Sequence, residues 1–239
     1  MKAPKASFVI PVYNGQAFLA ETIQSCLEQT NERIEIIVVD DGSRDATKDI
    51  LAHFQALDER IKVISLPENK GRSNARNVGI EAAQADIILT LDADDICLPD
   101  RVEKTLKFFK KNPGVDIAYS DCHNIDVWGE LIIFQDQHGN QTDTFPAMPF
   151  DIERVKKTLA TYIPCHSSMA CKKDVFKKVQ YTGGEWSSLC IDDWKLQTDA
   201  YKAGFKFGPI SRVLVRYRYM PKKRDEERIK AIKEAALAA

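Results

Sequence analysis

The sequence feature that most constrains the fold is a regular alternation of short apolar runs and helical segments over about the first 112 residues. The apolar runs read as strands because they are short, rich in β-branched residues and closed by turn-forming residues. They cover Ser7–Val12, Ile34–Val39, Ile61–Leu66 and Asp86–Leu91. Three predicted helices separate them: one from about Ala17 to Gln29, one carrying Ile50, Leu51, Phe54 and Leu57, and one ending near Ala83. Strands that alternate with helices across short joints predict βαβ units and a parallel sheet.

Right-handed connections would place the carboxyl ends of these strands at one edge of the sheet, called the rim below. Open α/β sheets bind their ligands at this edge. Several polar or aromatic residues are predicted to converge there: Tyr13, Asp40, Asp41, Arg76, Asp92 and Asp94.

The fourth apolar run ends in a cluster of carboxylates, Asp92, Asp94 and Asp95. Residues i and i+2 of an extended chain point to the same side, so Asp92 and Asp94 are predicted to project together. Two like charges held close repel each other unless a cation lies between them. Hard divalent cations bind one or two carboxylates and complete their shell with substrate phosphates. The pattern therefore predicts a divalent-cation site, and the alternative is a polar turn that caps the helix after Pro99.

The second half of the chain is less regular. Predicted strands cover Asp116–Tyr119, Leu131–Phe134, Met169–Cys171 and Val213–Tyr219. Predicted helices cover Pro99–Lys111, Asp151–Thr161, Lys173–Val179, a segment that opens around Asp192 and ends at Gly204, and the charged tail Met220–Ala239. Turn signals after Ser120 indicate a hairpin or an irregular excursion.

The composition narrows the classes of function. The chain has 34 basic and 35 acidic residues and a net charge of −1, which gives no support to nucleic acid as a partner. The sequence contains neither the glycine fingerprint of dinucleotide-binding proteins nor a P-loop. Its six cysteines form no CxxC pair and no zinc spacing, so free thiols are expected. Because no signal-peptide pattern and no apolar run of membrane-spanning length is visible, we expect a cytoplasmic protein.

Five short pieces stand in order along the chain: FVIPVYN (Phe8–Asn14), VVDDGS (Val38–Ser43), GRSNARN (Gly71–Asn77), DAD (Asp92–Asp94) and DDW (Asp192–Trp194). Together they resemble the inverting glycosyltransferases of family 2, and the resemblance covers about residues 5 to 220. The first four pieces are specific in order and spacing. In the fifth, that family more often has Glu-Asp where this chain has Asp192-Asp193.

The resemblance implies the GT-A fold, an α/β fold with a Rossmann-like, mostly parallel sheet flanked by helices and a mixed acceptor-side region. It implies one domain over residues 1–220, with a nucleotide-binding half at about 1–112 and an acceptor-side half at 113–220, and then a helical tail at 221–239. It implies transfer of a sugar from a nucleotide-sugar donor, which we expect to be UDP-linked, to a saccharide or lipid-linked acceptor hydroxyl.

The resemblance also assigns donor-binding roles. Pro11 and Tyr13 would contact the nucleoside, with Tyr13 stacked on the base. Asp41, or alternatively Asp40, would accept a hydrogen bond from the uracil imide. Arg76, with Arg72 as a second candidate, would lie near the base or the diphosphate.

The remaining roles concern the reacting groups. Asp92 and the neighbouring Ala93 would lie beside the ribose, and Asp94 together with Asp92 would hold Mn²⁺ or Mg²⁺ on the diphosphate. Asp193 would be the general base, with Asp192 as the alternative. The chemistry agrees: a divalent cation can neutralise the charge of a leaving diphosphate, and a carboxylate can take the proton of the acceptor hydroxyl. A single displacement with one base inverts the anomeric carbon.

Structural interpretations compete with these roles. Asp40-Asp41-Gly42-Ser43 could be a turn with a helix cap, and Asp192 or Asp193 could cap the helix that ends at Gly204. Arg76 could be a surface arginine. Four further residues have two interpretations each, as packing or solvated residues or as parts of the site: His166, Trp194, Arg216 and Arg218. The basic tail could lie on the inner face of a membrane, or it could be a docked or solvated helix.

Two other functions remain open from the sequence. A nucleotidyltransferase would normally have a glycine-rich phosphate loop with a nearby basic residue after the first strand, and Pro11–Gln16 contains neither. A non-catalytic nucleotide- or glycan-binding module would tolerate loss of the base, yet Asp192-Asp193 is retained. Hydrolysis of nucleotide sugars with and without an acceptor would separate the three functions.

Overall fold

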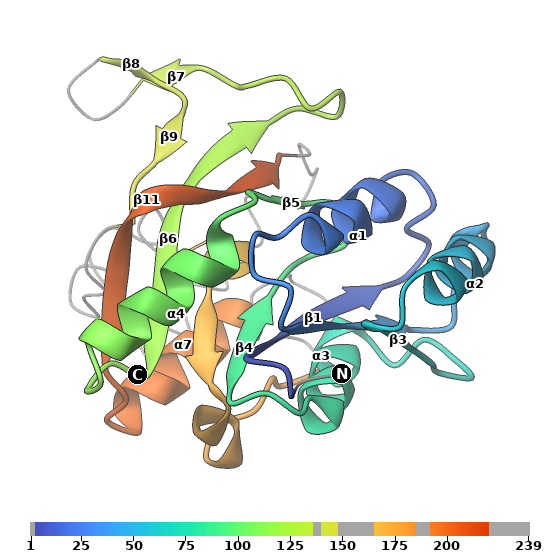
Figure 1. Cartoon of the computed structure of the whole chain (residues 1–239), viewed down its shortest axis with the longest axis horizontal. Coiled ribbons are helices and arrows are strands. Elements are labelled where there is room, and N and C mark those ends of the chain that lie inside the picture. The colour runs from blue at the N-terminus through green and yellow to red at the C-terminus, as the bar shows by residue number, and fades with distance from the viewer. Residues whose placement is uncertain (1–2, 136–139, 148–164, 185–191, 220–239) are drawn as a thin grey trace.

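The computed structural model describes residues 3–135, 140–147, 165–184 and 192–219. Within these ranges a nine-stranded sheet has the strand order β3-β2-β1-β4-β10-β6-β11-β5, and β9 pairs with β6 (Figure 1). Its strands are β1 (Ala6–Val12), β2 (Ile34–Asp40), β3 (Ile61–Ser65), β4 (Ile87–Thr90), β5 (Ile96–Cys97), β6 (Ile117–Ile125), β9 (Thr144–Phe145), β10 (Ala170–Lys172) and β11 (Phe207–Arg218). A separate ribbon pairs β7 (Phe134–Gln135) with β8 (Gln141–Thr142).

The sheet is mostly parallel. The first four strands pair in parallel, and β11 pairs in parallel with β6. The short strand β10 runs antiparallel to both β4 and β6, so β4 and β6 share one direction. The carboxyl ends of β1, β2, β3, β4, β6 and β11 therefore point to one edge, as the sequence predicts for the first four of them.

Helices cover both faces of the sheet (Figure 1). Buried side chains of α1 (Leu19–Leu27), α2 (Thr47–Leu57) and α4 (Arg101–Lys111) join one hydrophobic core. Those of α3 (Arg72–Ala82), α7 (Asp192–Lys202) and the 3₁₀ helix η2 (Lys173–Lys177) join a second core. Strands between two such layers are apolar along their whole length, which explains the continuous apolar runs of the sequence.

The alternation of side chains along a strand divides these two cores. In β1, Phe8 and Ile10 belong to the first core and Val9 to the second. In β2, Val38 belongs to the first core and Ile37 to the second. This is the period of two that a strand imposes on its side chains.

The predicted elements of the first half agree with the structure to within a few residues at each end. Later elements differ more. The strand predicted at Asp116–Tyr119 continues to Ile125, because partly polar residues beyond Tyr119 still pair with β9 and β11. The strand predicted at Val213–Tyr219 begins at Phe207, ahead of register shifts between Ile210 and Val215. At Leu131–Phe134 the structure has only an isolated bridge from Leu131 to Ile125 and the start of β7.

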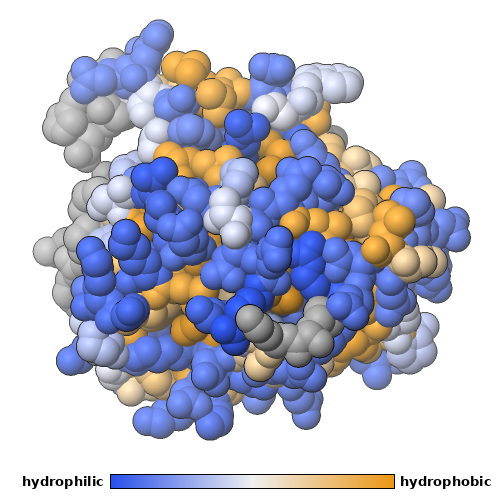
Figure 2. Space-filling model, viewed as in Figure 1, coloured by the Kyte–Doolittle hydropathy of each residue, from blue (hydrophilic) through white to orange (hydrophobic). Residues whose placement is uncertain are grey.

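Two predicted helices, 151–161 and the tail at 220–239, lie outside the described residues. Gly204 has a φ of +84° shortly after α7, in agreement with its predicted role as a helix-ending glycine. On the face shown in Figure 2, hydrophilic residues predominate and hydrophobic ones form small groups between them. Within the described ranges, no helix combines the length and the apolar character that crossing a bilayer would require.

Candidate functional site at the rim

Hydrogen bonds from main-chain N–H groups join two loops at the rim. The N–H groups of Asn14 and Gly15 donate to Ser43 Oγ at 2.9 Å and to Thr47 Oγ1 at 2.8 Å. The loop after β1 is thereby fixed to the loop after β2. It carries Tyr13, a residue that is 44% exposed. An exposed aromatic ring on a fixed backbone is suited to stacking on a planar ligand group.

Asp40 and Asp41 follow one another but hold different groups. Asp40 Oδ1 accepts the N–H of Ser43 at 2.9 Å, which is a turn contact, whereas its buried Oδ2 has no hydrogen-bond partner among the described residues. The Asp41 carboxylate accepts the N–H groups of Lys70 and Gly71, both at 2.8 Å. Asp41 therefore fixes the loop that leads into α3, and its oxygens keep further lone pairs for a ligand.

Asp92 lies just beyond β4 and is held from the protein side. Arg76 Nη2 donates to Asp92 Oδ1 at 2.6 Å, and His166 Nδ1 lies 3.5 Å from the same oxygen. The other ring nitrogen of His166 lies 2.7 Å from Tyr181 Oη. Burial alone would raise the pKa of Asp92, but the charge of Arg76 holds it well below its usual range. Asp92 is therefore ionised at neutral pH, and one of its oxygens is engaged by Arg76.

Arg76 also joins this strand end to the start of α7. Its Nη1 donates to Asp192 Oδ2 at 2.6 Å, while Arg72 Nε donates to Asp192 Oδ1 at 2.7 Å. Ser73 Oγ donates to Asp192 Oδ2 at 3.0 Å. Burial would raise the pKa of Asp192, but the two guanidinium groups lower it. Arg76 and Asp192 are both buried, so this is an ion cluster inside the protein rather than a surface pair. We call Arg72, Arg76, Asp92 and Asp192 the arginine cluster.

Asp193 has different surroundings from Asp192. Its side chain is partly exposed, and its Oδ1 accepts the N–H of Trp194 at 2.9 Å. Trp194 itself is buried, which agrees with its interpretation as a packing residue. Both oxygens of Asp192 accept hydrogen bonds from Arg72, Ser73 or Arg76, whereas Asp193 is partly exposed.

The Asp92–Asp95 loop concentrates negative charge. Asp94 is partly exposed, whereas Asp95 is fully buried and accepts the N–H of Arg218 at 2.7 Å. Burial, and then the charges of Asp94 and Asp92, raise the pKa of Asp95 well above its usual range. The buried Asp95 Oδ2 has no hydrogen-bond partner among the described residues.

Crowded carboxylates of this kind fit a hard cation. In the described ranges, however, no group of three or more His, Cys, Asp or Glu residues could hold a metal ion alone. A cation at Asp92 and Asp94 would therefore need further oxygens from a ligand, which is how Mg²⁺ is usually held on phosphates.

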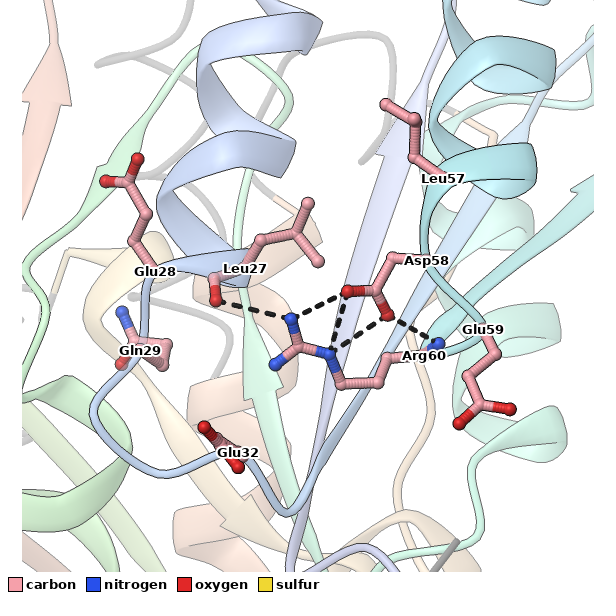
Figure 3. A pocket seen from close by; sticks show the side chains of 8 residues that line it. All are labelled: Leu27, Glu28, Gln29, Glu32, Leu57, Asp58, Glu59 and Arg60. Atoms are coloured by element: carbon pink, nitrogen blue, oxygen red, sulfur yellow. Dashed lines mark hydrogen bonds and ion pairs between the residues drawn. The ribbon is translucent and has the colours of Figure 1, made fainter.

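The structure also has a pocket away from the rim, which is not a candidate for the functional site. Figure 3 shows its lining, Leu27, Glu28, Gln29, Glu32, Leu57, Asp58, Glu59 and Arg60. Arg60 donates to the Asp58 carboxylate at 2.8 Å and to the Leu27 carbonyl at 3.4 Å. These residues end or follow α1 and α2, and in βαβ units the carboxyl ends of such helices lie at the edge of the sheet opposite the rim. None of the predicted site residues belongs to this pocket.

Sequence reasoning missed two features of the rim, Tyr181 and the burial of Arg218. His166, which the sequence left open as a structural histidine or a part of the site, lies with its Nδ1 3.5 Å from Asp92 Oδ1, and Tyr181 Oη lies 2.7 Å from its Nε2. Arg218, interpreted as a solvated residue or a diphosphate ligand, is instead buried and bound to the Asp92–Asp95 loop, whereas Arg216 is exposed. The alternating pattern of β11 gave no signal for this burial, because arginine on one strand face usually indicates solvent.

Comparisons with known proteins agree with this geometry. Residues 7–180 match the model of the family described as glycosyl transferase family 2. An uncharacterized glycosyltransferase of Methanocaldococcus jannaschii is 31% identical over 221 residues, 91% of this chain and 72% of that protein. Another, of Haemophilus influenzae, is 42% identical over 112 residues, 47% of this chain and 45% of that protein. Chondroitin synthase of Escherichia coli is 36% identical over 131 residues, 55% of this chain and 19% of that protein. The match thus spans less than half of the latter two relatives.

Solved structures share the fold. S. aureus TarS 1–349 in complex with UDP-GlcNAc has a TM-score of 0.73 at 17% identity, covering 98% of this chain and 66% of that one. The mannosyltransferase PcManGT from Pyrobaculum calidifontis, in complex with GDP-Man and Mn²⁺, has a TM-score of 0.67 at 17% identity, covering 99% of this chain and 63% of that one. These similarities confirm the expected GT-A fold.

Proposed function

The chain belongs to glycosyltransferase family 2, and from this premise we propose that it transfers a sugar, with inversion, from a UDP-linked donor to a hydroxyl of a glycan or lipid-linked acceptor. The observation that carries the proposal is the arrangement of acids around the arginine cluster. Asp92 and Asp94 follow β4, the partly exposed Asp193 lies next to Asp192 in the first turn of α7, and Arg76 bridges the two places by binding Asp92 and Asp192.

The nucleoside is proposed to bind between the loops after β1 and β2. The exposed ring of Tyr13 stacks on the base, and Pro11, buried in β1, fixes the strand end from which Tyr13 extends. Asp41 accepts a hydrogen bond from the uracil imide N–H. Its carboxylate oxygens each accept one main-chain N–H, from Lys70 and Gly71, and each can accept a further hydrogen bond. Asp40, whose second oxygen is buried with no hydrogen-bond partner in the part of the chain that the structure describes, is the alternative.

The diphosphate is proposed to lie beside Asp92, Ala93 and Asp94. Arg72 is 29% exposed in its side chain and can approach a phosphate, whereas Arg76, 2% exposed, acts by holding Asp92. Asp94 and the second oxygen of Asp92 would hold Mn²⁺ or Mg²⁺, which neutralises charge on the leaving diphosphate when bound. Support for this ligand class comes from the TarS complex with UDP-GlcNAc and the PcManGT complex with GDP-Man and Mn²⁺.

The general base is proposed to be Asp193. It takes the proton of the acceptor hydroxyl as the oxygen attacks the anomeric carbon, and the bond to the nucleoside diphosphate breaks on the opposite side. Asp192 keeps its two oxygens on the arginine cluster and so fixes the first turn of α7, which carries Asp193. The acceptor class is supported by the likeness to chondroitin synthase, a polysaccharide-forming relative by name.

The test combines UDP binding and turnover in two variants and a matched control. UDP with Mn²⁺ is expected to raise the melting temperature of the wild-type chain, and UDP with a chelator to raise it much less. Asp94→Asn should lose most of the Mn²⁺-dependent increase. Asp193→Asn should keep it, yet lower kcat for UDP release by about 10²–10⁴-fold, the usual effect of losing a general base.

The matched control is Asp86→Asn, which changes an exposed aspartate next to the opposite end of β4 and should alter neither readout. Equal stabilisation by UDP with and without Mn²⁺ would exclude the cation. Normal turnover of Asp193→Asn would exclude it as the base.

A further inference from the structure

Arg218 is an unusual residue for the end of a strand. It is the last residue of β11, and its side chain is only 1% exposed. Arg216, on the same strand two residues earlier, is exposed. Because β11 runs parallel to β6, its carboxyl end points to the rim, so Arg218 enters the candidate site from the acceptor-side half of the chain.

Two of its groups hold the Asp92–Asp95 loop. Arg218 Nε donates to the main-chain carbonyl of Asp94 at 2.8 Å. The main-chain N–H of Arg218 donates to Asp95 Oδ1 at 2.7 Å. The loop is therefore bound through its backbone at Asp94 and through a side chain at Asp95.

The rest of the guanidinium group is fixed by other segments. Its Nη1 donates to the carbonyl of Asp126 at 2.9 Å, in the turn that follows β6. Its Nη2 donates to Glu21 Oε2 at 2.6 Å, and the guanidinium carbon lies 4.4 Å from the centre of the Phe18 ring. One planar group thus joins the start of α1, the turn after β6 and the loop after β4.

A simple ion pair does not account for this arrangement. Glu21 is 53% exposed in its side chain, and an ion pair with so exposed a partner contributes little to stability. The Nε and Nη1 groups of Arg218 donate to main-chain carbonyls in two different directions. The planar guanidinium group of arginine can do this, whereas the single ammonium group of lysine cannot. The geometry is that of a support for the loop.

We propose that Arg218 is a positioning residue for the cation, a role that rests on the proposed function of Asp92 and Asp94. Asp92 is held through its carboxylate by Arg76, and Asp94 through its carbonyl by Arg218. Groups that orient metal ligands from behind contribute strongly to metal affinity, and their loss typically weakens it about 10–100-fold. Arg218 thereby makes the cation site of the nucleotide-binding half depend on the last strand of the acceptor-side half.

The experiment compares Arg218→Lys with Arg216→Lys. Both substitutions keep the positive charge, but only Arg218→Lys removes a guanidinium group from a buried position. UDP binding to the purified chain is titrated against Mn²⁺ at a temperature where each variant is folded, and again with a chelator. Arg218→Lys should need about 10–100-fold more Mn²⁺ for half of the metal-dependent increase in UDP affinity. Its affinity for UDP with chelator should match that of the wild type, and Arg216→Lys should match the wild type in both measurements.

The outcomes separate this inference from the proposed function. If the wild type responds to Mn²⁺ and Arg218→Lys needs no more Mn²⁺ than the wild type, even with a lower melting temperature, Arg218 is a structural support only and the inference fails alone. If Mn²⁺ does not change the affinity of the wild type for UDP, both the proposed cation site and the proposed role of Arg218 are wrong. Should Arg218→Lys not fold, Phe18→Leu replaces it, because it removes the ring against which the guanidinium group packs and leaves every charge in place. A higher Mn²⁺ requirement is expected of this variant, and an unchanged requirement overturns the inference.

Discussion

Asp192 and Asp193 show how burial assigns different tasks to identical neighbouring residues. Asp192 is enclosed by Arg72, Arg76 and Ser73, whereas Asp193 keeps an exposed side. The sequence predicts that one of the pair acts and the other supports, but it does not show which, because the choice depends on arginines about 120 residues away in the chain. The residues of the motifs could be predicted from the sequence, but which of them bind one another could not.

Asp192→Asn should therefore destabilise the fold. It leaves the buried Arg76 and the partly exposed Arg72 without their shared carboxylate, and breaking a buried ion pair typically costs about 3–5 kcal/mol. Asp193→Asn, at a partly exposed position, should change the free energy of unfolding by no more than about 0.5 kcal/mol. Urea unfolding of the two variants measures the difference, and equal stabilities would contradict the enclosed position of Asp192.

The contribution of Asp192 should also depend on pH. Its pKa is lower in the folded chain than in the unfolded chain, so its stabilisation is complete above the unfolded pKa of about 3.9 and is lost as the pH falls toward the folded pKa. The stability difference between the wild type and Asp192→Asn should stay constant from about pH 5 to 8 and shrink below about pH 4. A difference that grew on acidification would have the wrong sign.

At the scale of elements, α3 packs unusually close to the sheet. A Cβ atom built on Gly79 would lie 2.6 Å from Val9 Cγ1 in β1 and 3.2 Å from Val39 Cγ2 in β2. The glycine lets the helix that carries Arg72 and Arg76 approach the strands that end at the rim. Such an approach is invisible in the sequence, where a glycine inside a predicted helix only weakens the prediction.

Gly79→Ala should therefore lower stability although alanine favours a helix. The gain in helix propensity is about 1 kcal/mol, and overpacking a tight core costs about 1–3 kcal/mol, so a net loss of about 1 kcal/mol is expected. Gly114→Ala is the control, because an added Cβ there meets no atom within 4 Å. A stabilised Gly79→Ala variant would show that α3 can move away from the sheet without cost.

The elements that sequence reasoning found best are those buried on both faces. The strands β1, β2 and β4 are buried along their length and mostly apolar, and therefore stand out. The extension of β6 through Asp121 and His123 was missed because its partners, β9 and β11, come later in the chain. The strand β5 was missed because two residues carry no periodicity.

At the scale of the whole molecule, one sheet interleaves the two halves of the chain. Strand β10 of the second half separates β4 from β6, and β5 of the first half pairs with β11 of the second. A fragment of residues 1–112 would leave the β4 edge that faces β10 unpaired and Arg76 without Asp192. We expect it to show no cooperative unfolding in urea, and a sharp transition comparable to that of the full chain would contradict this interdependence.

The arginine cluster also limits which segments can be exchanged between two members of the family to make a chimeric protein. The family match ends at residue 180, whereas Asp192 and the whole of β11 lie beyond that boundary. A chimera that exchanged the acceptor-side segment at residue 180 would pair the arginines of one parent with the α7 start of another. Hybrids should fold and function only when Arg72, Arg76 and the carboxylate at position 192 all come from the same parent.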